Sequence, residues 1–316
     1  MRRALAAVVV LVLLGAGLVA AGSSAPTPRT YLLGALNLLR TRSIDRDRVD
    51  WPRAEAEALR AVEGVSTLSG TYPMIQAVIA ELGNPHTSLL SPAASEGAFG
   101  GDDRGAVEPR GGRHRGAEGS RFRCRPGGER RYVAAGVAAL QAVEARASCG
   151  WIVDLRGNSG GNMWPMLTVL APLLGDGVAG SFVGPGLAPE AWSIRGGRAW
   201  AGEHPETAEA NPVRLTRPEP PVAVLTSPRT ASSGEATLVA FRGLGRVATF
   251  GGPTAGFATS NEAFALADGA QLRVTTTFDA DRAGRIYGVE PIAPDFPAAD
   301  PEAAAGRWLR TRGGCA

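Results

Sequence analysis

Short apolar runs alternate with helical segments through the middle of the chain, and this alternation most constrains the fold. Residues 150–155, 221–226 and 247–250 are apolar and β-prone, as expected of buried strands. Helices are expected at residues 163–174 and from about 233 to 242, between those runs. Strands that alternate with helices predict a layered α/β core around a mostly parallel sheet. The content of 44% hydrophobic and 20% charged residues fits a globular core rather than a disordered chain.

The region before this core, residues 30–92, predicts a small N-terminal helical subdomain. Apolar residues recur near the helical period through residues 31–39. Asp50, two residues before a proline, is a candidate N-cap for a second helix. A third helix is expected at about residues 72–82, and it should end at Gly83.

Residues 93–131 break the pattern, because they are rich in arginine and glycine and lack apolar periodicity. We expect a loop or a disordered segment there. A shifted reading frame in G- and C-rich DNA would give a similar amino-acid sequence and is the alternative explanation. Order returns with a helix at residues 132–146, and a strand with one exposed face is expected at residues 272–277. We therefore expect the main domain to span residues 132–308.

The N-terminus has the features of an export signal. Two arginines follow the first methionine, and an unbroken apolar run covers residues 4–21. This pattern predicts a signal peptide over residues 1–21, cleaved after Ala21, with a linker at residues 22–29. An uncleaved membrane anchor is the alternative, whereas the lack of a cysteine just after the run argues against a lipoprotein. Either outcome places the protein outside the cytoplasm, in the cell envelope or the medium.

Export would allow cysteines to oxidise. The chain has three, an odd number, so at least one lacks a partner within the chain. A disulfide between Cys149, before a strand, and Cys315, at the C-terminus, is a hypothesis. Cys124 is the third cysteine.

Composition excludes several kinds of chemistry. The chain contains no lysine, so neither a Schiff base nor a Ser–Lys pair can form, because arginine does not lose its proton near neutral pH. The net charge of +3 gives no reason to expect nucleic acid as a partner. Three histidines lie far apart with no ligand spacing, so we expect no metal and no other cofactor. They are His86, His114 and His204.

The first candidate for chemistry is the Gly-rich turn at residues 157–161, which matches the G-x-S-x-G pattern around Ser159. It follows a strand and precedes a helix, the context of an α/β-hydrolase nucleophile. Only Asp176 and His204 follow it closely enough to act as partners, in a loop-rich region, and the strands that should precede it are missing. An esterase using Ser159 therefore remains an alternative. The other interpretation is a turn whose backbone N–H groups form half of an oxyanion hole.

The second candidate is Ser232, which follows another buried strand and begins a helix. Free backbone N–H groups at a helix N-terminus favour a developing negative charge. For this segment on its own, simple N-capping by Ser232 or Ser233 is the favoured explanation.

The two segments together resemble a known family. Residues 154–161, 230–235 and 251–256, with Asp268-Gly269 and Pro294-Asp295 later in the chain, are similar to the tail-specific or C-terminal processing peptidases. Residues 84–87 resemble the His-bearing motif of the branch that includes the tricorn core protease and the retinoid-binding repeats of the photoreceptor matrix.

The resemblance implies a ClpP/crotonase-like layered core and a serine peptidase acting on proteins or peptides. Ser232 takes the position of the nucleophile. The oxyanion donors would be the N–H groups of Ser233 and of Gly160 or Gly161. Glu235 and Thr254 would support the nucleophile loop. Peptide hydrolysis would run by acyl transfer.

The sequence departs from the lysine-using branch, because Phe257 occupies the position of the general base. His86 is the matching replacement, since a neutral imidazole suits the role near pH 7. Pro85 replaces the serine that precedes the histidine in the tricorn-like branch. Glu290 is the candidate acid that orients His86, and Asn261 is the alternative.

There is no room for a PDZ domain between His86 and Tyr132, and the Arg/Gly-rich segment occupies the place of the family's first core strand. The lost lysine, Pro85 and the Arg/Gly-rich segment leave a second hypothesis open, in which the protein is a catalytically silent binding protein on the same fold. Covalent labelling of Ser232 would distinguish the two.

Overall fold

The computed structural model describes residues 25–99, 116–118, 128–144 and 149–313. The predicted signal peptide, most of the Arg/Gly-rich segment, Cys124 and Cys315 lie outside the described residues. Cys149 is disulfide-bonded, and the choice between its two possible partners stays a prediction.

Three helices form the N-terminal part: α1 (Pro28–Arg42), α2 (Trp51–Ala61) and α3 (Tyr72–Leu82). Asp50 caps α2 as expected, accepting the N–H of Arg53 at 3.2 Å. Gly83 ends α3 in the left-handed conformation at φ 65°. The apolar faces of the helices pack on one another and on strand β11 (Gln271–Asp281) through Leu272 and Val274. The cluster is therefore closed by a strand that lies about 200 residues further along the chain.

The predicted parallel sheet contains five strands in the order β12-β9-β8-β3-β2, all paired in parallel. They are β2 (Gly116–Glu118), β3 (Trp151–Asp154), β8 (Val222–Thr226), β9 (Val247–Gly251) and β12 (Phe296–Pro297). Strand β2 lies within the Arg/Gly-rich segment, which occupies the place of the family's first core strand. The α/β fold class is thus confirmed.

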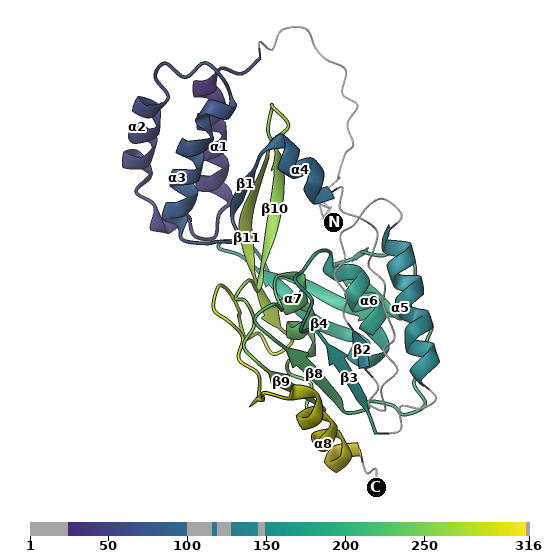
Figure 1. Cartoon of the computed structure of the whole chain (residues 1–316). Helices are drawn as coiled ribbons and strands as arrows, with labels where there is room; N and C mark the ends of the chain where they lie inside the picture. Colours follow the sequence, from purple (N-terminus) through teal and green to yellow (C-terminus); the bar gives the residue numbers. More distant parts are fainter. Residues whose placement is uncertain (1–24, 100–115, 119–127, 145–148, 314–316) are drawn as a thin grey trace, which may run out of the picture.

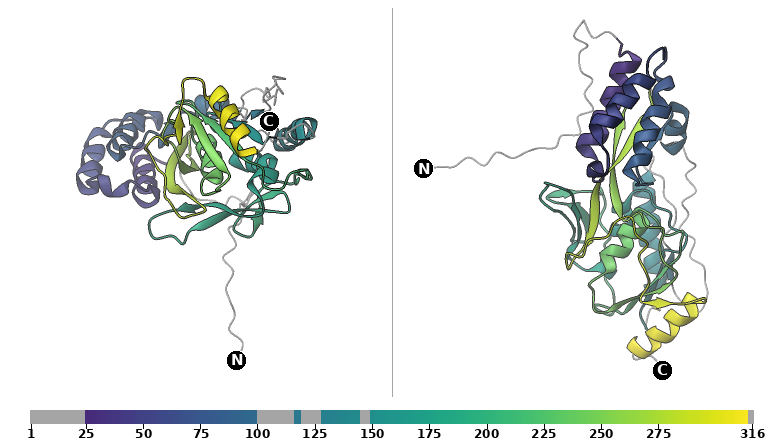
Figure 2. Two further views of the ribbon diagram at one scale, coloured as in Figure 1. Left: turned by 90° about the horizontal axis from the view of Figure 1, so that it is seen from below. Right: turned by 90° about the vertical axis from the view of Figure 1, so that its left-hand side faces the viewer.

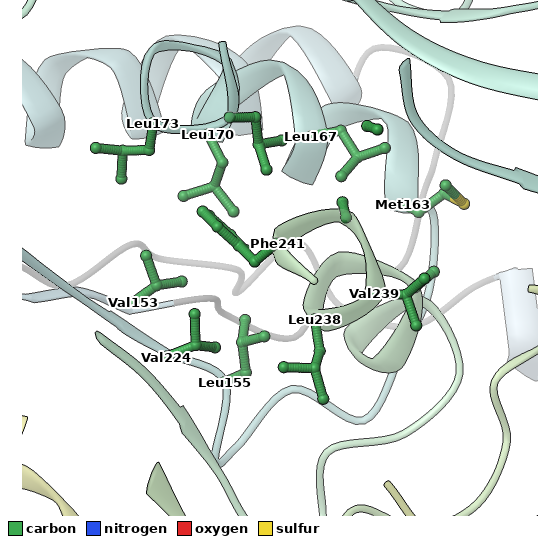
Figure 3. Packing of buried hydrophobic residues seen from close by; sticks show 14 of the residues in the cluster. Val153, Leu155, Met163, Leu167, Leu170, Leu173, Val224, Leu238, Val239 and Phe241 are labelled. Carbon is green, nitrogen blue, oxygen red and sulfur yellow. The ribbon is translucent and has the colours of Figure 1, made fainter. Parts of the chain in front are cut away.

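Helices cover both faces of this sheet. On one face, α6 (Met163–Leu174) and α7 (Ser233–Phe241) pack on Val153 and Val224, with α5 (Gly128–Glu144) outside α6. Figure 3 shows Leu167, Leu170 and Leu173 of α6 gathered around Phe241 of α7. On the other face, α8 (Pro301–Gly313) packs Ala305 and Leu309 on Ile152, Leu225 and Phe250. Successive strand residues face opposite layers, which explains why these runs are apolar throughout.

A second, antiparallel sheet continues from the core to the N-terminal helices (Figures 1 and 2). Its long β10–β11 hairpin lies beside α1 and α3, and the other half of β11 pairs with β4. The remaining strands are β1 (Ser88–Leu90), β4 (Gly177–Val183), β5 (Glu190–Arg195), β6 (Arg198–Ala201), β7 (His204–Pro205) and β10 (Thr259–Ala265). Tyr31 and Tyr72 donate to Asp268 beside the hairpin turn, at 2.8 and 2.6 Å.

Several sequence-based boundaries changed in the structure. Helix α6 has the bounds predicted for it, whereas α5 begins at Gly128, four residues earlier than expected. Part of the segment predicted to be a loop is helical, because α4 spans Pro92–Phe99. Within the described ranges, no helix has both the length and the apolar character needed to cross a membrane.

Candidate active site

Both candidate motifs lie at the carboxyl ends of neighbouring parallel strands. The Gly-rich turn follows β3, and the Ser232 turn follows β8, which pairs directly with β3. In a parallel sheet these ends meet at one edge, where open α/β folds place their ligands. Topology therefore brings together two segments about 70 residues apart.

Ser232 has an unusual backbone conformation. Its φ of 53° and ψ of −124° lie in a region of backbone conformation that residues other than glycine rarely adopt. Among the described residues other than glycine, only Glu219 shares a positive φ. Such a conformation costs about 1–3 kcal/mol and persists only where the surroundings impose it. The structure therefore holds this serine, at the N-terminus of α7, more tightly than a helix cap requires.

Glu235 supplies much of that constraint. Its buried carboxylate accepts the N–H groups of Ser232, Gly256 and Phe257 at 3.0, 2.9 and 2.6 Å, and also the hydroxyl of Thr254. Burial raises the pKa of Glu235 above its usual value, and these donors oppose the shift. The Glu235 carboxylate thus ties the serine turn to the Gly-rich segment that follows β9.

The Gly160 turn contacts the serine directly. A Cβ on Gly160 would lie 2.8 Å from Cβ of Ser232, and its φ of 105° also favours glycine. Buried Asn158 joins the two turns, since its Oδ1 accepts the N–H of Gly160 at 3.1 Å and its carbonyl accepts the N–H of Ala231 at 3.0 Å. The chain can approach the serine this closely only because residue 160 has no side chain.

Two backbone N–H groups near the serine are available for an oxyanion. Those of Ser233 and Gly161 donate to no residue in the described part of the chain. The Ser233 hydroxyl donates to the Gly161 carbonyl at 2.6 Å, which keeps the two residues together. The N–H of Gly160, the other donor expected from the sequence, is already engaged by Asn158.

His86 lies between α3 and β1 and is held from several sides. Its Nδ1 is 2.7 Å from Oγ1 of Thr259, and its ring meets Phe257 edge-on with centroids 5.2 Å apart. Its backbone N–H donates to Asn84, and its carbonyl accepts Nδ2 of Asn261, both at 3.0 Å. Asn261 thus fixes the backbone of His86 rather than its ring.

The surroundings of His86 keep its imidazole neutral. Burial, followed by the positive charge of Arg273, lowers its pKa from 6.5 to about 4. No hydrogen bond joins His86 to Ser232 among the described residues. Phe257 connects the two, because its N–H binds the same Glu235 carboxylate as Ser232 while its ring contacts His86. Catalytic hydrogen bonds often form only once substrate is bound.

Other residues named from the sequence lie apart from this arrangement. Glu290 is exposed and forms no hydrogen bond with His86, although its backbone lies against Gly256. Ser159 is exposed and contacts neither described histidine through a hydrogen bond. In the described ranges, no three His, Cys, Asp or Glu residues gather where they could hold a metal ion.

Sequence reasoning missed Asn158 and Thr259. Asn158 lies within the motif at residues 154–161, and its position directly before Ser159 and Gly160 was the only indication of its role. Thr259 carried no signal, because its partner His86 is 173 residues away.

Comparison with known proteins agrees with this arrangement. The model of peptidase family S41 matches residues 131–298, and the chain belongs to that family. The predicted resemblance to C-terminal processing peptidases is therefore confirmed, and membership supports serine peptidase chemistry in general. The assignment to the histidine-containing branch stays a prediction.

One curated relative is the nisin-resistance protein of Lactococcus lactis subsp. lactis. The two are 34% identical over 163 residues, which cover 52% of this chain and 50% of the relative. The chain thus matches about half the length of that protein.

Solved structures show the same fold. A lipoprotein from Streptococcus agalactiae has a TM-score of 0.75 at 24% identity, covering 91% of this chain and 97% of that one. The photosystem II D1 C-terminal processing protease has a TM-score of 0.58 at 15% identity, covering 91% and 98%. The ClpP/crotonase-like layered core expected from the sequence is confirmed at the level of fold.

Proposed function

We propose that the chain is an exported serine peptidase with Ser232 as nucleophile and His86 as general base. The observation that carries the proposal is the conformation of Ser232, which is strained, locked by Glu235 and placed at a helix N-terminus. A serine that served only as a helix cap could share the helix N-terminus and the bond from its N–H to Glu235, which form a capping box, but its backbone would be extended rather than at a positive φ. Strain of this kind clusters at active sites.

The hydrolysis proceeds in two balanced steps. Oγ of Ser232 attacks the peptide carbonyl carbon while Nε2 of His86 takes the hydroxyl proton. The N–H groups of Ser233 and Gly161 donate to the resulting oxyanion. The C–N bond then breaks, and His86 passes its proton to the departing amine. Water attacks the acyl-serine ester, again with His86 as base, which frees the acid and restores Ser232.

The supporting residues act through the two turns. Glu235 and Thr254 hold the serine loop, and Asn261 holds the backbone of His86. Gly160 provides room for Ser232 rather than an oxyanion donor, since its N–H is engaged. Glu290 as the acid that orients His86 stays a prediction, and turnover that changes by less than about threefold in Glu290→Gln would refute it.

The substrate is a protein or peptide rather than nucleic acid, and the location is outside the cytoplasm. The basic start and apolar run at residues 1–21 support export. The name of the Lactococcus relative makes nisin a rational first peptide to test, because that relative shares a third of its aligned residues with this chain.

The test is hydrolysis by the mature protein, residues 22–316. Nisin and a mixture of unmodified peptides would be incubated with the wild type, Ser232→Ala, His86→Ala and Ser159→Ala, and products identified by mass spectrometry. We expect cleavage by the wild type and by the Ser159 variant, and losses of at least about 100-fold in the other two. Cleavage that survives in Ser232→Ala but not in Ser159→Ala would assign the reaction to an esterase-like elbow. A folded wild type that cleaves nothing would favour the silent binding protein.

A further inference from the structure

We propose that the hydroxyl of Thr259 accepts the Nδ1–H of His86 and so positions the imidazole, the task that a carboxylate performs in a Ser-His-Asp triad. The proposal rests on the proposed function, because it concerns how His86 serves as base. It makes Thr259 a positioning residue, since it would act on the reaction only through the imidazole.

No described carboxylate forms a hydrogen bond with the ring of His86. Glu290 is exposed and forms no hydrogen bond with the ring. Both oxygens of Asp279 are buried and have no hydrogen-bond partner, whereas the carboxylate of Glu235 already accepts four donors. Oγ1 of Thr259, 2.7 Å from Nδ1, is the polar atom that the structure places on the imidazole.

Thr259 is itself held in position. The residue is 5% exposed, and it begins β10 by pairing with Phe278 of β11. Its N–H donates to the carbonyl of Phe257 at 2.8 Å, which forms a tight turn. The branched Cβ of threonine further restricts χ1. The hydroxyl is therefore presented to His86 by rigid backbone.

The same short segment touches the imidazole twice. Phe257 packs edge-on against the ring, and Thr259, two residues later, contacts Nδ1. Hydrogen bonds from Asn261 and to Asn84 also fix the backbone of His86. Phe257, which occupies the position of the lost lysine, thus begins the segment that supports the replacement base.

The direction of the Nδ1 hydrogen bond decides whether His86 can act. If Nδ1–H donates to Oγ1 of Thr259, the lone pair of Nε2 is free to take the proton of Ser232. If the hydroxyl donates to Nδ1, the proton sits on Nε2 and the base is blocked. Our proposal requires the first arrangement, with the Nδ1–H tautomer in the resting protein.

The test combines ring ¹⁵N NMR with kinetics. Protein with ¹⁵N-labelled histidine would be compared at pH 7 for the wild type, Thr259→Val and Thr259→Ser, with the His86 signals assigned by their loss in His86→Ala. Thr277→Val is the matched control, because it removes a buried hydroxyl of neighbouring β11 that has no hydrogen-bond partner in the described structure. Circular dichroism would establish that each variant is folded.

We expect an N–H type signal for Nδ1 and a bare-nitrogen signal for Nε2 in the wild type and in Thr259→Ser. Thr259→Val should mix the tautomers and lower kcat by about tenfold with KM unchanged, the loss expected for one hydrogen bond. Thr259→Ser should recover most of that loss, and Thr277→Val should match the wild type.

An Nε2–H tautomer in the wild type would overturn the proposal, as would an unchanged tautomer and kcat in a folded Thr259→Val. The wild-type spectrum decides even if that variant does not fold. It also needs no turnover, so a protein with the Nδ1–H tautomer but no activity would refute the proposed function and leave this inference standing.

Discussion

Replacing Asp279 with asparagine should make the protein more stable, and increasingly so as the pH rises. Asp279 is 1% exposed, and neither carboxyl oxygen has a hydrogen-bond partner among the described residues. Burial, together with the negative charge of Glu235, raises its pKa well above 3.8. Folding therefore keeps a proton on Asp279 that the unfolded chain releases above about pH 4.

The size of the effect follows from this proton. Between pH 4 and the raised pKa, the folded state binds one more proton at this site than the unfolded state. The free energy of unfolding therefore falls by about 1.4 kcal/mol for each pH unit of increase, and becomes level above the folded pKa. Asparagine has a similar shape and no such proton. The difference between variant and wild type should thus be near zero at pH 4 and grow with that slope.

The assay is guanidinium unfolding of both proteins at pH 4, 5, 6 and 7. Carboxyl groups common to the two proteins cancel in the difference. Glu63→Gln, which removes an exposed carboxyl without a side-chain hydrogen bond in the described structure, should shift stability by less than about 0.5 kcal/mol. A variant less stable than the wild type at pH 7, or a difference that stays flat from pH 5 to 7, would show that Asp279 is ionised and paired.

Three further predictions concern the serine turn, the base and the hairpin. Gly160→Ala should lower kcat/KM by about 100-fold, because the new Cβ would lie 2.8 Å from Cβ of Ser232. The control Gly157→Ala adds a Cβ that meets nothing within 4 Å and should keep activity, so equal rates for the two variants would contradict this prediction. With the pKa of His86 at about 4, kcat/KM should hold from pH 7 to 5 and fall below pH 4, and an inflection near 6.5 would rule out a buried base. Tyr31→Phe should cost about 1–2 kcal/mol in thermal unfolding through its lost bond to Asp268, and an unchanged Tm would refute that role.

The core elements could be predicted because their signals are local. The strand at residues 151–154 and the helix at residues 163–174 combine strong apolar runs with nearby glycines, and the structure reproduces both. The end of α3 at Gly83 depends on a single left-handed residue. Ser232 stood out for the same reason, since a strand, a serine and a helix follow one another directly.

The antiparallel sheet and helix α4 could not be predicted in the same way. Strands β4 and β5 are short, mix polar with apolar residues and gain their order from pairing with each other and with β11. Tertiary pairing of this kind overrides weak local propensity. A loop was the expectation for the segment that contains most of α4.

The details of the site depend on contacts between distant residues. The bond between His86 and Thr259 spans 173 residues, and the isolation of Asp279 depends on how α7 and β11 pack. Neither leaves a pattern in one sequence. The family resemblance named His86 and Ser232 as candidates, but it could not show that Gly160 has its N–H engaged or that Glu290 is exposed.

Covalent labelling tests the central claim most directly. The protein comprising residues 22–316 would be treated with a fluorophosphonate at pH 7 and digested, and the modified peptide located by mass spectrometry, with Ser232→Ala and His86→Ala alongside. We predict a label on Ser232 in the wild type and none at that position in either variant, since the hydroxyl must lose its proton to His86 to react. A label on Ser159, or no label on a folded protein, would contradict the account.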